Sequence, residues 1–166
     1  MVGHYTRSGA VRAILIATII AGTLDILAAF AFAIAAGGSP AGVLRGICGA
    51  VVDPEHLPAL AVPLLDTSVT PLLLGLALHF AIMAVMAAVY VSSAAHLPWL
   101  NRVPVLSGLA YGLVLWLVMF WLVLPLRWPT LFPTADPNDI AMQLSCHLLL
   151  VGVPIALVTK RAARWI

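Results

Sequence analysis

One long apolar stretch with a histidine inside it constrains this chain more than any other feature. The stretch is Pro71–Val91, PLLLGLALHFAIMAVMAAVYV, and as a helix it matches the thickness of a lipid bilayer. It carries His79, and an imidazole at that depth costs free energy unless a partner or a cavity receives it. We therefore expect a membrane-spanning helix whose histidine meets polar groups from other helices.

The composition supports a membrane protein. Hydrophobic residues make up 63% of the 166 residues, charged residues make up only 8%, and the mean hydropathy is +1.12. A soluble domain carries about 25% charged residues. The expected partner is therefore the lipid bilayer, and a net charge of +2 gives no reason to expect nucleic acid. Cys48 and Cys146 make no disulfide framework, so we expect two free thiols.

Four stretches are long and apolar enough to span a membrane within a single domain, residues 1–166. The expected spans are residues 13–36, 71–91, 104–124 and 140–159. The sequence thus predicts an all-α, polytopic membrane protein with four transmembrane helices. The first span also resembles a signal peptide, but it is longer than a signal h-region and contains Asp25, so we expect it to stay uncleaved.

The segment between the first two spans, residues 41–65, is apolar but has no stretch long enough to cross. Gly37-Gly38-Ser39-Pro40 is typical of one helix ending and another beginning. We expect a short re-entrant or interfacial helix over Ala41–Val52, on the outer face of the membrane. A proline-broken loop at Leu57–Leu65 should follow, with Asp66-Thr67-Ser68 as the cap of the next helix.

The cations set the expected orientation. Most of them gather on the side of the two termini and the second loop: Arg7, Arg12, Arg102, Lys160, Arg161 and Arg164. Only Arg45 and Arg127 lie on the other side, so the positive-inside rule places both termini in the cytoplasm. On the outer face we expect Arg45 to form a salt bridge with Asp53, Asp66 or Asp136, or to meet an anionic headgroup.

Three polar side chains fall at similar depths in three different spans. His79 and His147 lie about 11–12 Å below the outer ends of their helices, and Asp25 lies about 16 Å below the outer end of the first span. Inside a bilayer such groups need each other, water or a ligand. Two interpretations stay open, namely a structural cluster that fixes helix register and the lining of a small polar cavity.

Two narrower interpretations use the same histidines. A haem needs two imidazoles at one depth on facing helices, which His79 and His147 satisfy. A copper site is the second, because His79, Met83 and Met86 share one helix face and Cys146 lies on the fourth span. The plainer interpretation is that these methionines fill gaps in an apolar core.

Gly108 and Gly112 stand at GxxxG spacing in the third span, which allows a second helix to approach closely. The partner is another span, a second copy of the chain or a different membrane subunit. Catalysis is not indicated. Ser145 is followed by Cys146 and His147, but adjacent residues of a helix do not face each other, and the sequence has no phosphate loop, HExxH or nucleophile elbow.

Five sequence blocks carry a resemblance to a known family. They are AGTLDI (Ala21–Ile26), PAGVLRGICGAVV (Pro40–Val52), LGLALHFAIMAVMAAVYV (Leu74–Val91), GLAYGLVLWLVMFWLVLPL (Gly108–Leu126) and HLLLVGVPIALVTKRA (His147–Ala162). In this order they resemble small four-helix bacterial inner-membrane proteins of uncharacterised function. The resemblance implies that Asp25, His79 and His147 occupy the family's polar positions. The re-entrant block departs from the family pattern, because GICG replaces a sequence closer to IASGLLG.

The leading hypothesis is a non-enzymatic inner-membrane protein. Its cluster of Asp25, His79 and His147 is structural or lines a small cavity for a proton or a small solute. One alternative is a haem- or metal-binding module that uses the two histidines. The other is an accessory subunit that packs against a membrane partner.

Overall fold

The computed structural model describes residues 7–52 and 69–162. Within these two ranges the chain forms helices and short connections and contains no strand. The expected all-α fold is therefore confirmed for the described residues. The expected loop Leu57–Leu65 and the expected cap Asp66-Thr67-Ser68 lie outside them.

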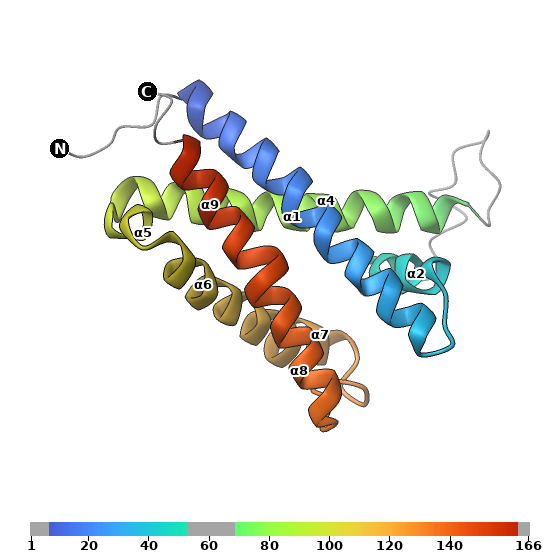
Figure 1. Ribbon diagram of the computed structural model, residues 1–166. Helices are drawn as coiled ribbons and strands as arrows, with labels where there is room; N and C mark the ends of the chain where they lie inside the picture. Colours follow the sequence, from blue (N-terminus) through green and yellow to red (C-terminus); the bar gives the residue numbers. More distant parts are fainter. Residues whose placement is uncertain (1–6, 53–68, 163–166) are drawn as a thin grey trace. The chain divides into compact units, whose positions relative to one another are not determined.

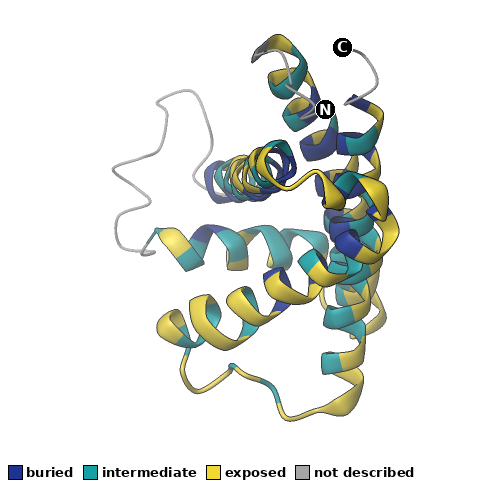
Figure 2. Ribbon diagram, turned by 90° about the vertical axis from the view of Figure 1, so that its left-hand side faces the viewer, coloured by how far each residue is buried: buried dark blue, intermediate teal, exposed yellow. Residues whose placement is uncertain are grey.

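Four helical runs are long and apolar enough to cross a membrane, as the sequence predicts. They are Ser8–Ala35, Thr70–His96, Pro104–Arg127 and Pro137–Ala162. No more than 33% of the most apolar window of any of them is buried, and exposed residues recur along their whole lengths (Figure 2). Large apolar side chains such as Leu15, Val85 and Leu106 are more than half exposed. A surface of this kind suggests a membrane location, because lipid rather than water suits it.

Most ends of these runs lie beyond the expected limits, but the first run ends at Ala35, one residue short, and the third begins at Pro104 as expected. The helices of the described residues are α1 (Arg7–Ala35), α2 (Pro40–Val51), α4 (Thr70–His96), α5 (Trp99–Arg102), α6 (Pro104–Val118), η2 (Met119–Val123), α7 (Leu124–Arg127), α8 (Pro137–Cys146), η3 (His147–Gly152) and α9 (Val153–Ala162). The α4 helix continues past the serines expected to end it, because Ser93 Oγ donates back to Val89 O at 2.8 Å and stays within the helix.

The turn between α1 and α2 has the predicted chemistry. Gly37 has a positive φ of 78°, and the N–H of Gly38 donates to Ala33 O at 2.8 Å, which closes the end of α1. Ser39 is the N-cap of α2, and its Oγ accepts from the N–H of Gly42 at 3.1 Å. Pro40 follows at the first position of α2. A short helix therefore follows the first span; its re-entrant or interfacial character and its place on the outer face stay predictions.

The contacts divide the chain into two compact units, Met1–Asp25 with Met83–Ile166, and Ile26–Ile82. In the second unit, α2 and the first half of α4 touch through Gly75, where an added Cβ would collide with the Leu44 carbonyl. In the first unit, the start of α1 meets the last parts of α4 and α9. Three residues that are fully or almost fully buried make this contact: Ala13, Val91 and Ala162. The single-domain organisation stays a prediction.

The closest helix pairing of the first unit joins α6 to η3 and α9, which run side by side (Figure 1). A Cβ on Gly108 would lie 2.8 Å from Gly152 O, and a Cβ on Gly112 would lie 2.7 Å from Leu148 Cα. The backbones therefore touch where side chains normally intervene. We call Gly108, Gly112 and Gly152 the glycine seam. It sets an antiparallel register in which Gly108 faces Gly152 and Gly112 faces the start of η3.

Two spans contain a π-helical turn, and in each a proline lies two residues beyond the end of the turn. The N–H of Leu124 donates to Met119 O, five residues back, and Pro125 follows. The N–H of Val153 donates to Leu148 O, again five residues back, and Pro154 follows. A proline has no N–H, and its ring clashes with the carbonyl four residues earlier. The wider turn accommodates the ring and lets the helix continue to Arg127 rather than end at Pro125.

Candidate functional site

His147 begins the π-helical turn η3 and has one ring nitrogen engaged. Its Nδ1 lies 2.9 Å from Gln143 O, which also accepts the backbone N–H of His147. A carbonyl oxygen only accepts, so in the neutral ring the proton is assigned to Nδ1. Nε2 then keeps its lone pair, and no described residue bonds to it. The ring therefore offers Nε2 as an acceptor to a hydrogen-bond donor.

Aromatic rings connect His147 to the loop between α7 and α8. The ring of Phe120, in η2, contacts the imidazole edge-on, with 5.4 Å between the centroids and 84° between the planes. Phe132 of the loop packs against Phe120 at 5.9 Å, and Trp128 packs against Phe132 at 6.4 Å. We call Phe120, Phe132 and Trp128 the aromatic column. Through Phe120, the aromatic column joins η2 to the start of η3 at His147. The groups that lie between His147 and the loop are therefore apolar rings.

Asp25 lies near the same turn of the last span. It is half-buried in α1, and its carboxyl is close enough to the Cys146 thiol for the two to interact electrostatically. Cys146 directly precedes His147, so the aspartate approaches the last span at the depth of the histidine. A direct contact between Asp25 and His147 stays a prediction.

His79 belongs to the second unit and is 7% exposed. Its ring packs edge-on against Phe80, with centroids 5.3 Å apart. Met83, Met86 and Tyr90, which follow at helical spacing, are also buried. The histidine is thus on the buried face of α4. Its membership of a cluster with Asp25 and His147 stays a prediction.

No group of three or more His, Cys, Asp or Glu side chains that could hold a metal occurs in residues 7–52 and 69–162. Met83 and Met86 are 4% and 9% exposed and fill the buried face of α4, as thioethers do in apolar cores. The haem and copper sites stay predictions.

The remaining sites expected from the sequence are placed as follows. Arg45 is exposed on α2, and its expected partners Asp53 and Asp66 lie outside the described residues. Gly108 and Gly112 are buried in the glycine seam, where they face another span of the same chain.

Hydroxyl groups join α4 to α6 in a second polar cluster, which the sequence analysis missed. Ser107 Oγ lies 2.9 Å from Leu100 O and can give its only hydrogen to that carbonyl. Tyr90 OH, 2.8 Å away, is then the donor to Ser107 Oγ. Tyr111 OH donates to Met86 O at 2.7 Å, and its ring packs 5.0 Å from that of Tyr90. A pocket of about 220 Å³ adjoins this cluster. Every hydroxyl hydrogen has an acceptor, so the cluster is suited to holding helices together.

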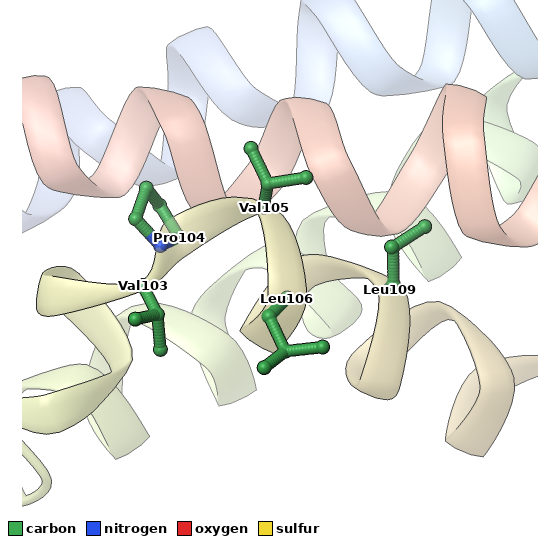
Figure 3. Close-up of a pocket in the computed structure, with 5 residues that line it drawn as sticks. All are labelled: Val103, Pro104, Val105, Leu106 and Leu109. Carbon is green, nitrogen blue, oxygen red and sulfur yellow. The ribbon is translucent and has the colours of Figure 1, made fainter.

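An apolar depression of about 380 Å³ lies at the start of α6 (Figure 3). Its lining consists of aliphatic side chains and a proline: Val103, Pro104, Val105, Leu106 and Leu109. None of these groups can orient a polar ligand. The depression suits contact with lipid tails and does not add to the polar site.

No family model, curated protein or solved structure matches this chain. The site is therefore interpreted from its own residues. Sequence reasoning found Asp25, His79 and His147 because polar residues stand out in apolar spans. It missed Phe120 and Phe132, because aromatic residues are ordinary there and only the fold brings these two to the histidine.

Proposed function

We propose that the protein is a non-enzymatic integral protein of the bacterial inner membrane, in which a polar site around His147 takes up a proton or a small solute. Asp25 is the further polar group of this site within the same unit. The observation that carries the proposal is the state of the His147 ring, whose Nδ1 is engaged with Gln143 O while Nε2 has no hydrogen bond to any described residue. An imidazole held in this way can gain and lose a proton at a single nitrogen without moving its backbone.

The surroundings of His147 support the same function. It begins a π-helical turn, a feature that is frequent at functional sites. Asp25, on another span, is close enough to influence the neighbouring Cys146. Ionisable groups inside a membrane commonly mark ion or proton pathways.

Proton flux in liposomes tests the proposal. Wild-type protein, reconstituted with a pH-sensitive dye inside the vesicles and driven by a potassium diffusion potential, should acidify the lumen several-fold faster than empty vesicles. His147→Gln should bring the rate down to that of empty vesicles, since an amide does not titrate at neutral pH. His96→Gln is the matched control, because His96 is an exposed residue at the end of α4. Equal rates for the wild type and His147→Gln would remove the proton pathway.

The proposal includes an orientation. Both termini lie in the cytoplasm, and α2 lies on the outer face, which the distribution of Lys and Arg supports. A C-terminal fluorescent-protein fusion should therefore be fluorescent in cells, and a C-terminal alkaline phosphatase fusion should be inactive. The opposite pair of results would reverse the orientation without affecting the His147 site.

A further inference from the structure

The buried polar atoms of the first unit that find no hydrogen-bond partner among the described residues include two on the third and fourth spans. These two are the indole Nε1 of Trp116 and the amide Oε1 of Gln143. Trp116 is only 8% exposed, so its N–H cannot turn outward to solvent. A buried donor or acceptor without a hydrogen bond is costly, and native structures contain few of them.

The two atoms belong to residues at the same level of the helix pair that the third and fourth spans form. The glycine seam places Gly112 against the start of η3 at His147. Trp116 lies one helical turn beyond Gly112, and Gln143 lies one turn before His147. Because the helices are antiparallel, both steps lead in the same direction along the pair. The ring contact between Phe120 and His147 holds the helices together at this level.

The chemistry of these atoms is complementary but incomplete. An indole N–H only donates, and an amide oxygen only accepts. No direct hydrogen bond joins them. The group that satisfies both must accept from Trp116 and donate to Gln143. His147, at the start of η3, lies four residues after Gln143 and so on the same face of the fourth span, and its Nε2 offers a second acceptor.

We propose that a water molecule binds between Trp116, Gln143 and His147. It accepts a hydrogen bond from Trp116 Nε1 and donates its two hydrogens to Gln143 Oε1 and His147 Nε2. Three hydrogen bonds are the usual number for a buried water. The water belongs to the site of the proposed function, but its binding does not depend on proton flux through that site.

Proton NMR of the protein labelled with ¹⁵N-tryptophan tests the proposal directly. The chain has five tryptophans, and Trp116→Phe identifies the Trp116 indole signal by removing it. In wild-type protein this indole proton should show a cross-peak to the water resonance. The absence of a cross-peak would overturn the proposal. A cross-peak to a lipid or detergent hydroxyl instead would also overturn it and identify another occupant.

A double-mutant cycle gives an independent readout. Trp116→Phe and Gln143→Met each remove one partner of the water and should each lower the thermal midpoint of unfolding. The double variant should lose less than the sum of the two, because the water has already lost its site in either single variant. Additive losses, or a higher midpoint for Gln143→Met, would show that no water molecule couples Trp116 to Gln143. Loss of flux in His147→Gln with additive losses in this cycle would retain the proposed function and reject the water.

Discussion

The ring of Phe120 meets the imidazole of His147 edge-on at 5.4 Å, and each residue belongs to a π-helical turn that precedes a proline. The two π-helical turns thus meet at His147, whose Nδ1 is hydrogen-bonded to Gln143 O. A π-helical turn costs helix stability and persists where the surrounding structure gains from it. Here the two turns place the rings of Phe120 and His147 in contact.

Phe132→Ala should expose the region of His147. The substitution removes the ring that packs on Phe120 at 5.9 Å and opens the aromatic column. Cys146 serves as the reporter in a Cys48→Ser background, since the chain has two cysteines. The solubilised protein should then react several-fold faster with a water-soluble methanethiosulfonate. Phe32→Ala, at an exposed phenylalanine of α1, is the control and should leave the rate unchanged. The same rate in both variants would show that the column does not shield this turn.

Gly112→Ala should destabilise the protein. The added Cβ would lie 2.7 Å from Leu148 Cα, which is backbone and cannot rotate away. Overpacking of this kind typically costs about 1–3 kcal/mol, which thermal unfolding in detergent measures. Gly46→Ala on α2 is a matched control, because no atom lies within 4 Å of its Cβ position. This control should be stabilising by up to about 1 kcal/mol through helix propensity. Equal effects on stability at Gly112 and Gly46 would contradict the backbone contact at the glycine seam.

Ser107→Ala should lower stability by about 1–3 kcal/mol, because it removes the hydrogen bonds that Ser107 Oγ forms with Tyr90 OH and with the carbonyl of the buried Leu100. Chemical unfolding followed by circular dichroism measures the loss. Ser145→Ala is the comparison, since Ser145 is exposed and bonds only to Ala141 O in its own helix. It should change stability by less than about 0.5 kcal/mol. A small effect of Ser107→Ala would mean that another group replaces the hydroxyl.

Cys48 should react slowly with iodoacetamide at neutral pH. Burial raises the pKa of its thiol above the ordinary value of 9.0, and the thiolate is the reactive form. The folded state holds this proton more tightly than the unfolded state. Its contribution to stability is therefore full below pH 9.0 and falls as the pH rises above that value.

In a Cys146→Ser variant the labelling rate of Cys48 should keep rising above pH 9. Protein unfolded in dodecyl sulfate should follow the profile of an ordinary thiol. A folded protein that labels with the unfolded profile would contradict a buried thiol.

Hydropathy alone predicts the four spans, because an apolar helix of bilayer length has few other stable environments. The turn after α1 was equally predictable, since Gly37 supplies the positive φ and Ser39 supplies the cap. The ends of the helices were less predictable from the sequence. Ser93 satisfies its own hydroxyl within the helix, and the π-helical turn before Pro125 removes the clash that would have ended the helix.

The contents of the site were only partly predictable. Asp25, His79 and His147 stand out because each is polar in an apolar span. The roles of Trp116 and Phe120 depend on a register that two glycines and their partner helix set, and no spacing within one helix encodes it. Tyr90 and Ser107 form a similar case, because their hydrogen bond joins two spans.

The glycine seam has a mechanical consequence. With backbone against backbone at Gly108, Gly112 and Gly152, the third and fourth spans cannot slide past or rock on each other without losing contact along their whole length. The third and fourth spans therefore behave as one rigid unit. A change in the surroundings of His147 would therefore move other helices or the loop that carries Phe132 against this pair, rather than move its two members apart.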